Sequence, residues 1–225
     1  MTGATMTGSK IGETVGGQGR ARGRPKTRSD EAERQRIVQS ARDLFLDVGY
    51  GGTTMDAVAA RCGVSKRTLY QLFPAKTDLF RVMVADHRRS MLALPRDPGE
   101  DLPLVEALAA IFRLDIDEID DRDRLAFVRL VLADSDRFSE IGEVIVEEGA
   151  EPARRLLEDW LVAQQERGRL RPFPAGAMAR MLMDMIFSVL IKRFPGDRLP
   201  TVEERARHAR LCLEVFLEGA EAKAT

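Results

Sequence analysis

Apolar residues recur along this chain of 225 residues at the three- and four-residue spacing of α-helices. In the stretch 29–49, which Gly49 is expected to end, one apolar stripe is formed by Ile37, Ala41, Leu44, Phe45 and Val48. Further helical segments are predicted at 76–94, 103–119, 122–134, 140–167, 175–194 and 201–221. Glycine and proline mark most of the breaks, and no stretch alternates like a strand over a useful length. The sequence therefore predicts an all-α protein.

Between the first two of these segments, the stretch 53–76 predicts two short helices joined by a tight turn. The first of the two buries one face, made of Met55, Val58, Ala59 and Cys62. Gly63 ends it, because glycine enters the left-handed conformation without steric cost. Ser65 then supplies the oxygen that caps the next helix. In that second helix Leu69 and Phe73 lie one turn apart and are expected to face inward.

The other face of the second short helix is polar. At 100° per residue it presents Lys66, Arg67, Thr68, Tyr70 and Gln71. Arginine and lysine pair with guanine, glutamine pairs with adenine, and a threonine methyl can meet that of thymine. A rigid short helix with this face suits the major groove of DNA. The alternative is a helix pair of ordinary all-α packing, which is common and unrelated to DNA.

The distribution of charge favours the DNA-binding interpretation. The whole chain has a net charge of −1, but residues 1–89 hold 16 Lys/Arg and 9 Asp/Glu, a net charge of +7. Residues 90–225 hold 19 Lys/Arg and 27 Asp/Glu, a net charge of −8. A basic part attracts the phosphate backbone, whereas an acidic part stays away from it.

The N-terminal stretch 1–28 is expected to be a disordered basic arm. Within residues 19–28 basic residues alternate with small residues and proline: Arg20, Arg22, Arg24, Lys26 and Arg28. The run Arg22-Gly23-Arg24-Pro25 resembles the core of an AT-hook, which lies in a narrow minor groove. Two interpretations stay open for Arg22 and Arg24, namely contact with the minor groove and an idle solvated tail.

Residues 49–80, GYGGTTMDAVAARCGVSKRTLYQLFPAKTDLF, resemble the helix-turn-helix of the TetR/AcrR transcriptional regulators. The matching positions are Gly49, Thr53, Thr54, Val58, Ala59, Gly63, Val64, Ser65, Leu69, Tyr70, Phe73, Lys76 and Leu79. The resemblance implies that Thr53 or Thr54 and Tyr70 touch phosphates and that Lys76 clamps a phosphate. It also implies that residues 66–71 face the bases. Leu72 departs from the pattern, because family members commonly carry histidine or another polar residue there.

The last two segments, 175–194 and 201–221, are apolar nearly all the way round, so each is expected to have two packing partners. A membrane span is not expected, because Asp184 interrupts the first run and neither reaches about 18 uncharged apolar residues. The second face is therefore expected to meet a copy of itself. The resemblance implies the same, a four-helix dimer interface. The candidate interface residues are Met178, Leu182, Met183, Phe187, Leu190, Leu213, Phe216 and Leu217.

The resemblance further implies that a small, apolar effector binds among the middle helices and changes the register of two DNA-reading heads. The candidate lining residues, each equally suited to an ordinary core, are Phe112, Ile116, Phe127, Leu130, Val131, Met181 and Met185. The acidic residues of 115–123 are interpreted as a solvated face, because their helical spacing is irregular, no calcium-loop glycine is present, and Arg122 and Arg124 are interleaved with them.

No enzyme motif is present. The two histidines, His87 and His208, lie on charged segments where they are expected to face solvent, and the two cysteines, Cys62 and Cys212, are far apart. Metalloprotease, Cys-x-x-Cys, nucleophile-elbow and phosphate-loop patterns do not occur. We therefore expect no catalytic residues, no metal and no cofactor. Two lone thiols and the lack of a readable signal peptide fit the cytoplasm.

Together these observations predict an arm at 1–28, a three-helix helix-turn-helix domain at 29–76 and a larger helical effector-binding and dimerisation domain at 77–225. The linking helix is expected at about 76–94. The predicted function is a homodimeric, ligand-responsive transcriptional regulator, and the resemblance implies a repressor that a small apolar effector releases from a palindromic operator. The alternative is an architectural dimer that binds double-stranded DNA with little sequence preference.

Overall fold

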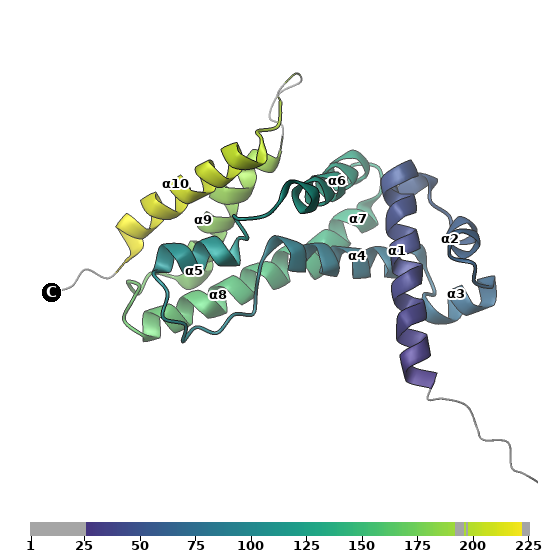
Figure 1. The fold of residues 1–225 in the computed structure, drawn as a ribbon, viewed down its shortest axis with the longest axis horizontal. Coiled ribbons are helices and arrows are strands. Elements are labelled where there is room, and N and C mark those ends of the chain that lie inside the picture. Colours follow the sequence, from purple (N-terminus) through teal and green to yellow (C-terminus); the bar gives the residue numbers. More distant parts are fainter. Residues whose placement is uncertain (1–25, 192–195, 197, 222–225) are drawn as a thin grey trace, which may run out of the picture.

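The structure, a computed structural model, describes residues 26–191, 196 and 198–221 (Figure 1). Within these residues every element is a helix, as the sequence predicts. The basic arm, with Arg22 and Arg24, lies outside the described residues. α1, α2 and α3 lie at one end of an elongated molecule, α9 and α10 lie at the other end, and α6 lies between them (Figure 1).

The N-terminal part contains four helices. They are α1 (Lys26–Gly52), α2 (Met55–Cys62), α3 (Lys66–Leu72) and α4 (Lys76–Met91). Gly49 interrupts α1 with a φ of 76°, and Gly63 ends α2 with a φ of 69°. Ser65 Oγ accepts the N–H of Thr68 at 3.1 Å and so caps α3. The break, the stop and the cap are those that the sequence predicts.

Where the structure describes it, the C-terminal part contains six α-helices and two short turns of other helical types. They are α5 (Leu104–Ile111), α6 (Glu118–Asp134), α7 (Ser139–Val144), the π-helical turn η1 (Ile145–Ala150), α8 (Glu151–Glu166), α9 (Ala175–Phe187), the 3-10 turn η2 (Ser188–Leu190) and α10 (Val202–Ala220). The predicted segment 103–119 is divided after Ile111, where Arg113 has a φ of 51° and the chain turns. The predicted segment 140–167 is helical throughout but contains η1, which periodicity does not reveal.

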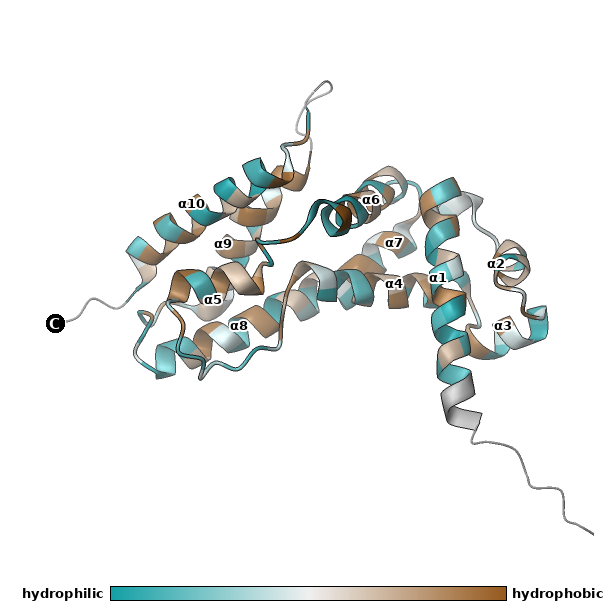
Figure 2. Cartoon of the chain, in the orientation of Figure 1, coloured by the Kyte–Doolittle hydropathy of each residue, from teal (hydrophilic) through white to brown (hydrophobic). Residues whose placement is uncertain are grey.

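Buried apolar residues form two cores, whose brown positions line the inner faces of the helices in Figure 2. The N-terminal core joins residues of α1 to α4 with four residues from the other domain: Phe127, Leu130, Ile141 and Val144. The C-terminal core packs α5, α8, α9 and α10 around Leu108, Leu157, Leu161 and Leu213. The N-terminal core thus continues into α6 and α7, beyond the domain boundary that the sequence predicts near residue 76.

A buried carboxylate fastens the two parts together. The backbone N–H of Tyr50 donates to Asp134 Oδ2 at 2.7 Å, and Asp134 is 7% exposed. A Cβ on the preceding Gly49 would lie 3.1 Å from the same oxygen, and the φ of 76° also requires glycine there. The ring of Tyr50 packs on Phe45 and Phe80. The C-terminal end of α6 is therefore fixed to the end of α1.

We predict that Asp134→Ala lowers the free energy of unfolding by about 1–3 kcal/mol, because the buried N–H of Tyr50 loses its charged acceptor. The measurement is urea denaturation of the full chain. The matched control is Asp136→Ala, whose exposed side chain is only two residues away and whose effect should stay within about 0.5 kcal/mol. Equal effects of the two substitutions would show that the buried carboxylate does not fasten the two parts.

Candidate functional sites

The polar face of α3 is open to solvent. Leu69 and Phe73 are buried and hold the helix against the N-terminal core. Lys66, Arg67 and Gln71 are exposed, and Tyr70 is 48% exposed, as the helical spacing predicts. Thr68 is half-buried, and its hydroxyl lies 2.8 Å from that of Ser65. Leu72 is also half-buried and packs against the N-terminal core, which explains an apolar residue at that position.

Lys66 has a carboxylate partner on the neighbouring helix. Its Nζ donates to Asp56 Oδ2 at 2.6 Å, and both side chains are exposed. This hydrogen bond raises the pKa of Lys66. The pair holds the lysine at the rim of the α3 face, where an approaching phosphate or base would compete with Asp56 for it.

Thr53 and Thr54 have different environments. Thr54 is exposed and caps α2, because its Oγ1 accepts the N–H of Ala57 at 3.1 Å. Thr53 is 1% exposed, and its hydroxyl donates to the carbonyl of Gly49 at 2.8 Å. Of these two candidate phosphate contacts, the structure therefore leaves Thr54 available and uses Thr53 inside the protein.

Lys76 does not present a free ammonium to DNA, contrary to its predicted position. Its Nζ donates to the carbonyls of Tyr50 at 2.7 Å and Thr53 at 3.2 Å. It also lies 4.0 Å from the ring centroid of Tyr50, which adds a cation–π contact. Burial lowers the pKa of Lys76. These partners are distant in sequence, so the local motif could not show that the lysine closes the end of α1.

A cavity of about 230 Å³ lies between α4, α6, η1, α8 and the end of α9. Its apolar walls include Met91, Phe127, Met183, Phe187 and Leu190, and its polar walls are His87 and Arg88. A smaller pocket of about 60 Å³ adjoins it and shares Met91, Phe187 and Leu190. A concave apolar space with a few polar groups is the usual form of a small-molecule site.

His87 is part of this cavity rather than of the solvent-facing surface that the sequence predicts. Its ring stacks on Phe127 with 4.3 Å between centroids. Burial, and then the charges of Arg42 and Arg124, lower the pKa of His87 to about 4. The imidazole is therefore neutral near pH 7. Its spacing in the sequence could have revealed this position, because His87 lies four residues after the buried Met83 and so continues the inner face of α4.

The predicted lining residues divide into three groups. Phe127 lines the larger cavity, and Phe112 and Ile116 line the smaller pocket. Leu130 and Val131 pack in the N-terminal core instead. Met181 and Met185 were assigned to the wrong side of α9, because they line an outer groove between α9 and α10.

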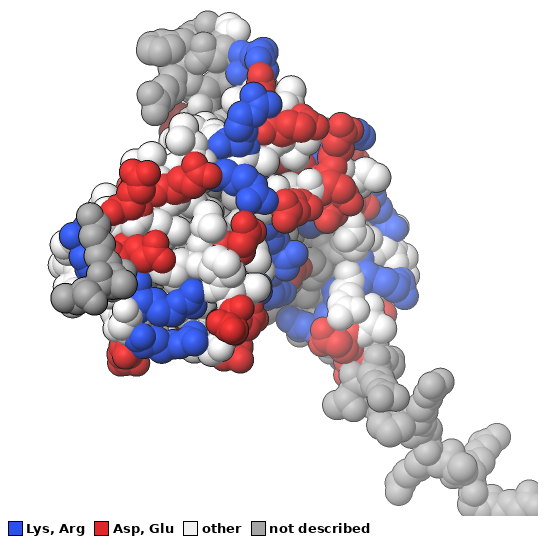
Figure 3. Space-filling view, turned by 60° about the vertical axis from the view of Figure 1, so that its left-hand side comes forward, with Lys and Arg blue, Asp and Glu red and all other residues white. Residues whose placement is uncertain are grey.

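The outer groove belongs to an exposed apolar face of α9 and α10. Met181 is 54% exposed, Leu211 is 58% exposed and Val215 is 59% exposed. Acidic and basic side chains are interspersed at this end of the molecule, which comes forward in Figure 3. A copy of the chain that approached this end would therefore meet no large patch of one sign of charge.

Most predicted interface residues point away from this apolar face, so the assignment needs correction. Leu182, Leu213 and Leu217 are buried in the C-terminal core, and Met178 and Phe216 are buried there too but also line the outer groove. Three others are half-buried on the cavity side of α9 and η2: Met183, Phe187 and Leu190. A helix that is apolar all the way round carries no sequence signal for which side packs inside its own chain. The packing against α5 and α8 decides it.

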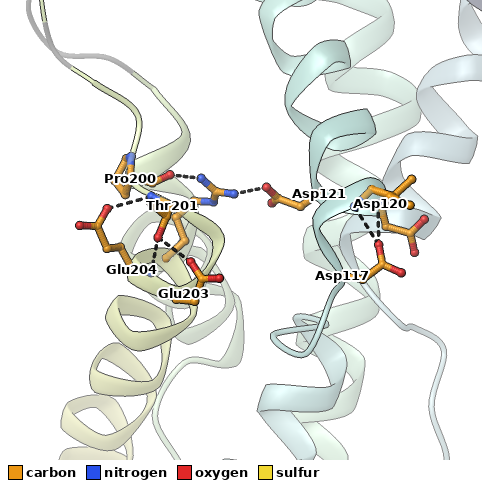
Figure 4. A network of polar contacts seen from close by, with 9 residues as sticks. Asp117, Asp120, Asp121, Pro200, Thr201, Glu203 and Glu204 are labelled. Atoms are coloured by element: carbon orange, nitrogen blue, oxygen red, sulfur yellow. Dashed lines mark hydrogen bonds and ion pairs between the residues drawn. The ribbon is translucent and has the colours of Figure 1, made fainter.

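An ion pair joins the N-terminal ends of α6 and α10 above the smaller pocket. The guanidinium of Arg205 donates to Asp121 Oδ2 and to the carbonyl of Pro200, and Arg205 is 8% exposed (Figure 4). Thr201 Oγ1 accepts the N–H of Glu204 at 3.3 Å and caps α10 beside this pair (Figure 4). α6, which contributes residues to the N-terminal core, is therefore also tied to the N-terminal end of α10.

Among the helices that the structure describes, none has the length and apolarity that a membrane crossing requires.

Comparison with known families agrees with this division of the chain. Residues 37–83 match the family described as bacterial regulatory proteins, tetR family. Residues 106–219 match the family described as AefR-like transcriptional repressor, C-terminal domain. Both the helix-turn-helix part and the part that contains the cavity therefore match families of transcriptional regulators.

Individual proteins show the same likeness. The HTH-type transcriptional regulator UidR of Escherichia coli K12 is 26% identical over 159 residues, which cover 70% of this chain and 79% of UidR. A TetR-family regulator from Mesorhizobium loti superposes with a TM-score of 0.67 at 26% identity, covering 85% of this chain and 98% of that one. The flavonoid-responsive regulator FrrA superposes with a TM-score of 0.62 at 25% identity, covering 86% and 100%.

The depressed pKa of His87 predicts a loss of stability in mild acid. The unfolded chain takes up a proton at this residue near pH 6.5, whereas the folded protein does so only near pH 4. Between these values the unfolded state binds more protons, so the free energy of unfolding falls as pH falls, by at most about 3 kcal/mol. Urea denaturation across this window should show a shallower fall for His87→Gln than for wild type.

The control for this prediction is Gln71→Ala, a change at an exposed residue of α3 that removes no titratable group and should keep the wild-type dependence on pH. Carboxylates that titrate below about pH 5 contribute equally to all three proteins, so the difference between curves isolates the imidazole. A His87→Gln curve parallel to wild type would show that the ring is accessible to protons in the folded state.

Proposed function

The chain belongs to the TetR family of bacterial regulatory proteins and is a DNA-binding transcriptional regulator, not an enzyme, and from this premise we propose that it is a homodimeric repressor. In this proposal it binds a palindromic operator and leaves it when a small effector fills the cavity. The observation that carries the proposal is the exposed polar face of α3, held on a buried Leu69 and Phe73.

In the proposed complex, α3 enters the major groove. Arg67 and Gln71 lie at the centre of its exposed face and read bases, and Lys66 contacts a base or a phosphate after it leaves Asp56. Thr54 and Tyr70 contact phosphates at the rim of the groove. Arg22 and Arg24 are proposed to extend the contact into the adjacent minor groove.

The dimer is proposed to form through the exposed face of α9 and α10. Three exposed apolar side chains and an outer groove lie there, and such a patch is unfavourable in water. A two-fold axis at this end would keep the two α3 helices apart at the opposite end (Figure 1). Two heads about one helical turn of DNA apart would read the two halves of a palindrome.

Release is proposed to begin in the cavity. α4 contributes His87 and Met91 to its wall, and α6 contributes Phe127. Both helices also carry residues of the N-terminal core, so a shift in either moves the DNA-reading end. An effector that binds better to the shifted arrangement lowers affinity for the operator, by an amount that cannot exceed its preference.

The first test is selection of duplex DNA from a random pool at near-physiological salt. Wild type should recover a palindrome with two half-sites. Arg67→Ala should weaken binding to that palindrome by about 1–3 kcal/mol and relax the sequence at one base pair in each half-site. The control is Arg155→Ala, an exposed arginine on α8, which should recover the wild-type palindrome.

Two results would contradict the proposed reading of DNA. Recovery of A·T-rich sequences without symmetry would favour an architectural protein that binds through its arm. If Arg67→Ala weakened all sequences equally, Arg67 would be a phosphate contact and the base-reading role would be wrong.

The proposed dimer is tested by Val215→Glu, which places a charge in the exposed apolar face of α10. We expect wild type to sediment as a dimer and the variant as a monomer, because a desolvated, unpaired carboxylate is costly in an interface. Val48→Glu is the control, since Val48 is 54% exposed on α1 at the other end of the molecule. A dimeric Val215→Glu would place the interface elsewhere.

A further inference from the structure

The smaller pocket has a wall of unexpected charge. Three arginines line it, Arg113, Arg124 and Arg205, with a single carboxylate, Asp121. Arg88 adds a further positive charge to the wall of the larger cavity. Residues 90–225 as a whole carry a net charge of −8. The walls of the smaller pocket and the larger cavity therefore carry a net positive charge, whereas the domain that contains them carries a net negative charge.

One of these arginines lacks a partner for a buried atom. Arg205 and Asp121 neutralise each other. Arg124, on α6, has a buried Nε with no hydrogen-bond partner within the described residues. Burial, and then the charge of Arg113, lower the pKa of Arg124 to about 10, so the guanidinium remains charged at neutral pH.

The carboxylates around Arg124 leave its guanidinium without an ion-pair partner. Asp120 and Asp121 are near enough to favour its charged form, and Asp115 and Asp117 line the outer depression that Arg124 also borders. Within residues 26–191 and 198–221 none of them forms an ion pair with Arg124. Asp121 is already engaged with Arg205, and Asp117 accepts the N–H groups of Ile119 and Asp120 as the cap of α6.

Arg124 is half-buried, and its buried Nε lacks a hydrogen-bond partner, which is unfavourable in a folded protein and needs an explanation. An anion that enters the pocket supplies one. A guanidinium presents coplanar pairs of N–H donors that match the two oxygens of a carboxylate. The remaining walls are apolar and include Phe112, Leu114 and Phe187.

From this arrangement we propose that the effector is an amphipathic acid whose carboxylate binds Arg124 and whose apolar body extends past Phe187 into the larger cavity. The inference rests on the proposed effector function and specifies the chemical class of the ligand. The neutral imidazole of His87, in the wall of the larger cavity, can form one more hydrogen bond to a polar substituent.

The test compares acids with neutral molecules of the same shape. The probes are phenylacetate and phenylacetamide, and octanoate and octanamide, each titrated into the full chain by calorimetry. At least one acid should bind wild type at least about tenfold more tightly than its amide. Arg124→Gln should lose at least about tenfold in affinity for that acid and little for the amide, since only the acid uses the charge.

The matched control is Arg122→Gln, an exposed arginine two residues away on the same helix, which should bind the acid as wild type does. Thermal unfolding without ligand separates this role from a structural one. Removal of a half-buried charge without an ion-pair partner should leave Tm unchanged or raise it, whereas loss of a structural arginine would lower it. If Arg124→Gln does not fold, Arg124→Lys keeps a charge without the paired donors and should still weaken acid binding.

Equal affinity of acid and amide, no binding of either acid to wild type, or an Arg124→Gln variant that binds the acid normally would each overturn the inference. These failures differ from failure of the proposed function. Release of the selected palindrome by a neutral compound, with no effect of the acids, would retain the ligand-responsive repressor and reject the anionic ligand. Failure to select any palindrome would reject the repressor whatever the acids do.

Discussion

The hydrogen bond from the Tyr50 N–H to the Asp134 carboxylate is the contact on which the arrangement of the two ends depends. It satisfies a backbone donor at the break in α1, where helical bonding is interrupted by Gly49. The same carboxylate fills the space next to Gly49, so a larger residue there would displace it. If Asp134 were lost or displaced, the C-terminal end of α6 would no longer be held to the end of α1, and the two cores would no longer be joined by this hydrogen bond.

Because of that contact, α6 connects the cavity and the DNA-reading end as one rigid element. Arg124 and Phe127 lie at the cavity end of the helix, and Asp134 lies at its C-terminus. Ten residues of α-helix separate Arg124 from Asp134, a length of about 15 Å. α4 makes a second connection, since His87 lines the cavity while Phe80 packs under Tyr50. The sequence suggested α4 alone as the link, because α6 joins the N-terminal core only through tertiary contacts.

Local chemistry explains how much could be predicted. Gly63 and Ser65 act through their own backbone conformation and a neighbouring N–H, so the turn and the polar face of α3 were readable from the sequence. The role of Lys76 was not, because its partners are carbonyls 23 and 26 residues away. The phase of α9 was not either, since apolar residues all round it give no preferred side, and only packing against α8 separates Met178 from Met181. Arg124 looked like part of a solvated acidic stretch for the same reason.

The exposed apolar face and the cavity lie on opposite sides of α9. Met181 faces outward, whereas Met183 and Phe187 face the cavity that Arg124 borders through the smaller pocket. A ligand that moves α9 would therefore act on the proposed dimer contact as well as on α6. To convert a mostly bound population to a mostly released one, the ligand must prefer the released state by about 5.5 kcal/mol. A charged hydrogen bond to Arg124 contributes about 1.5–3 kcal/mol. The remainder corresponds to about 100–160 Å² of apolar surface at about 25 cal/mol per Å². Where these contacts are made only in the released state, a charge combined with an apolar body reaches this preference with a smaller ligand than either group alone.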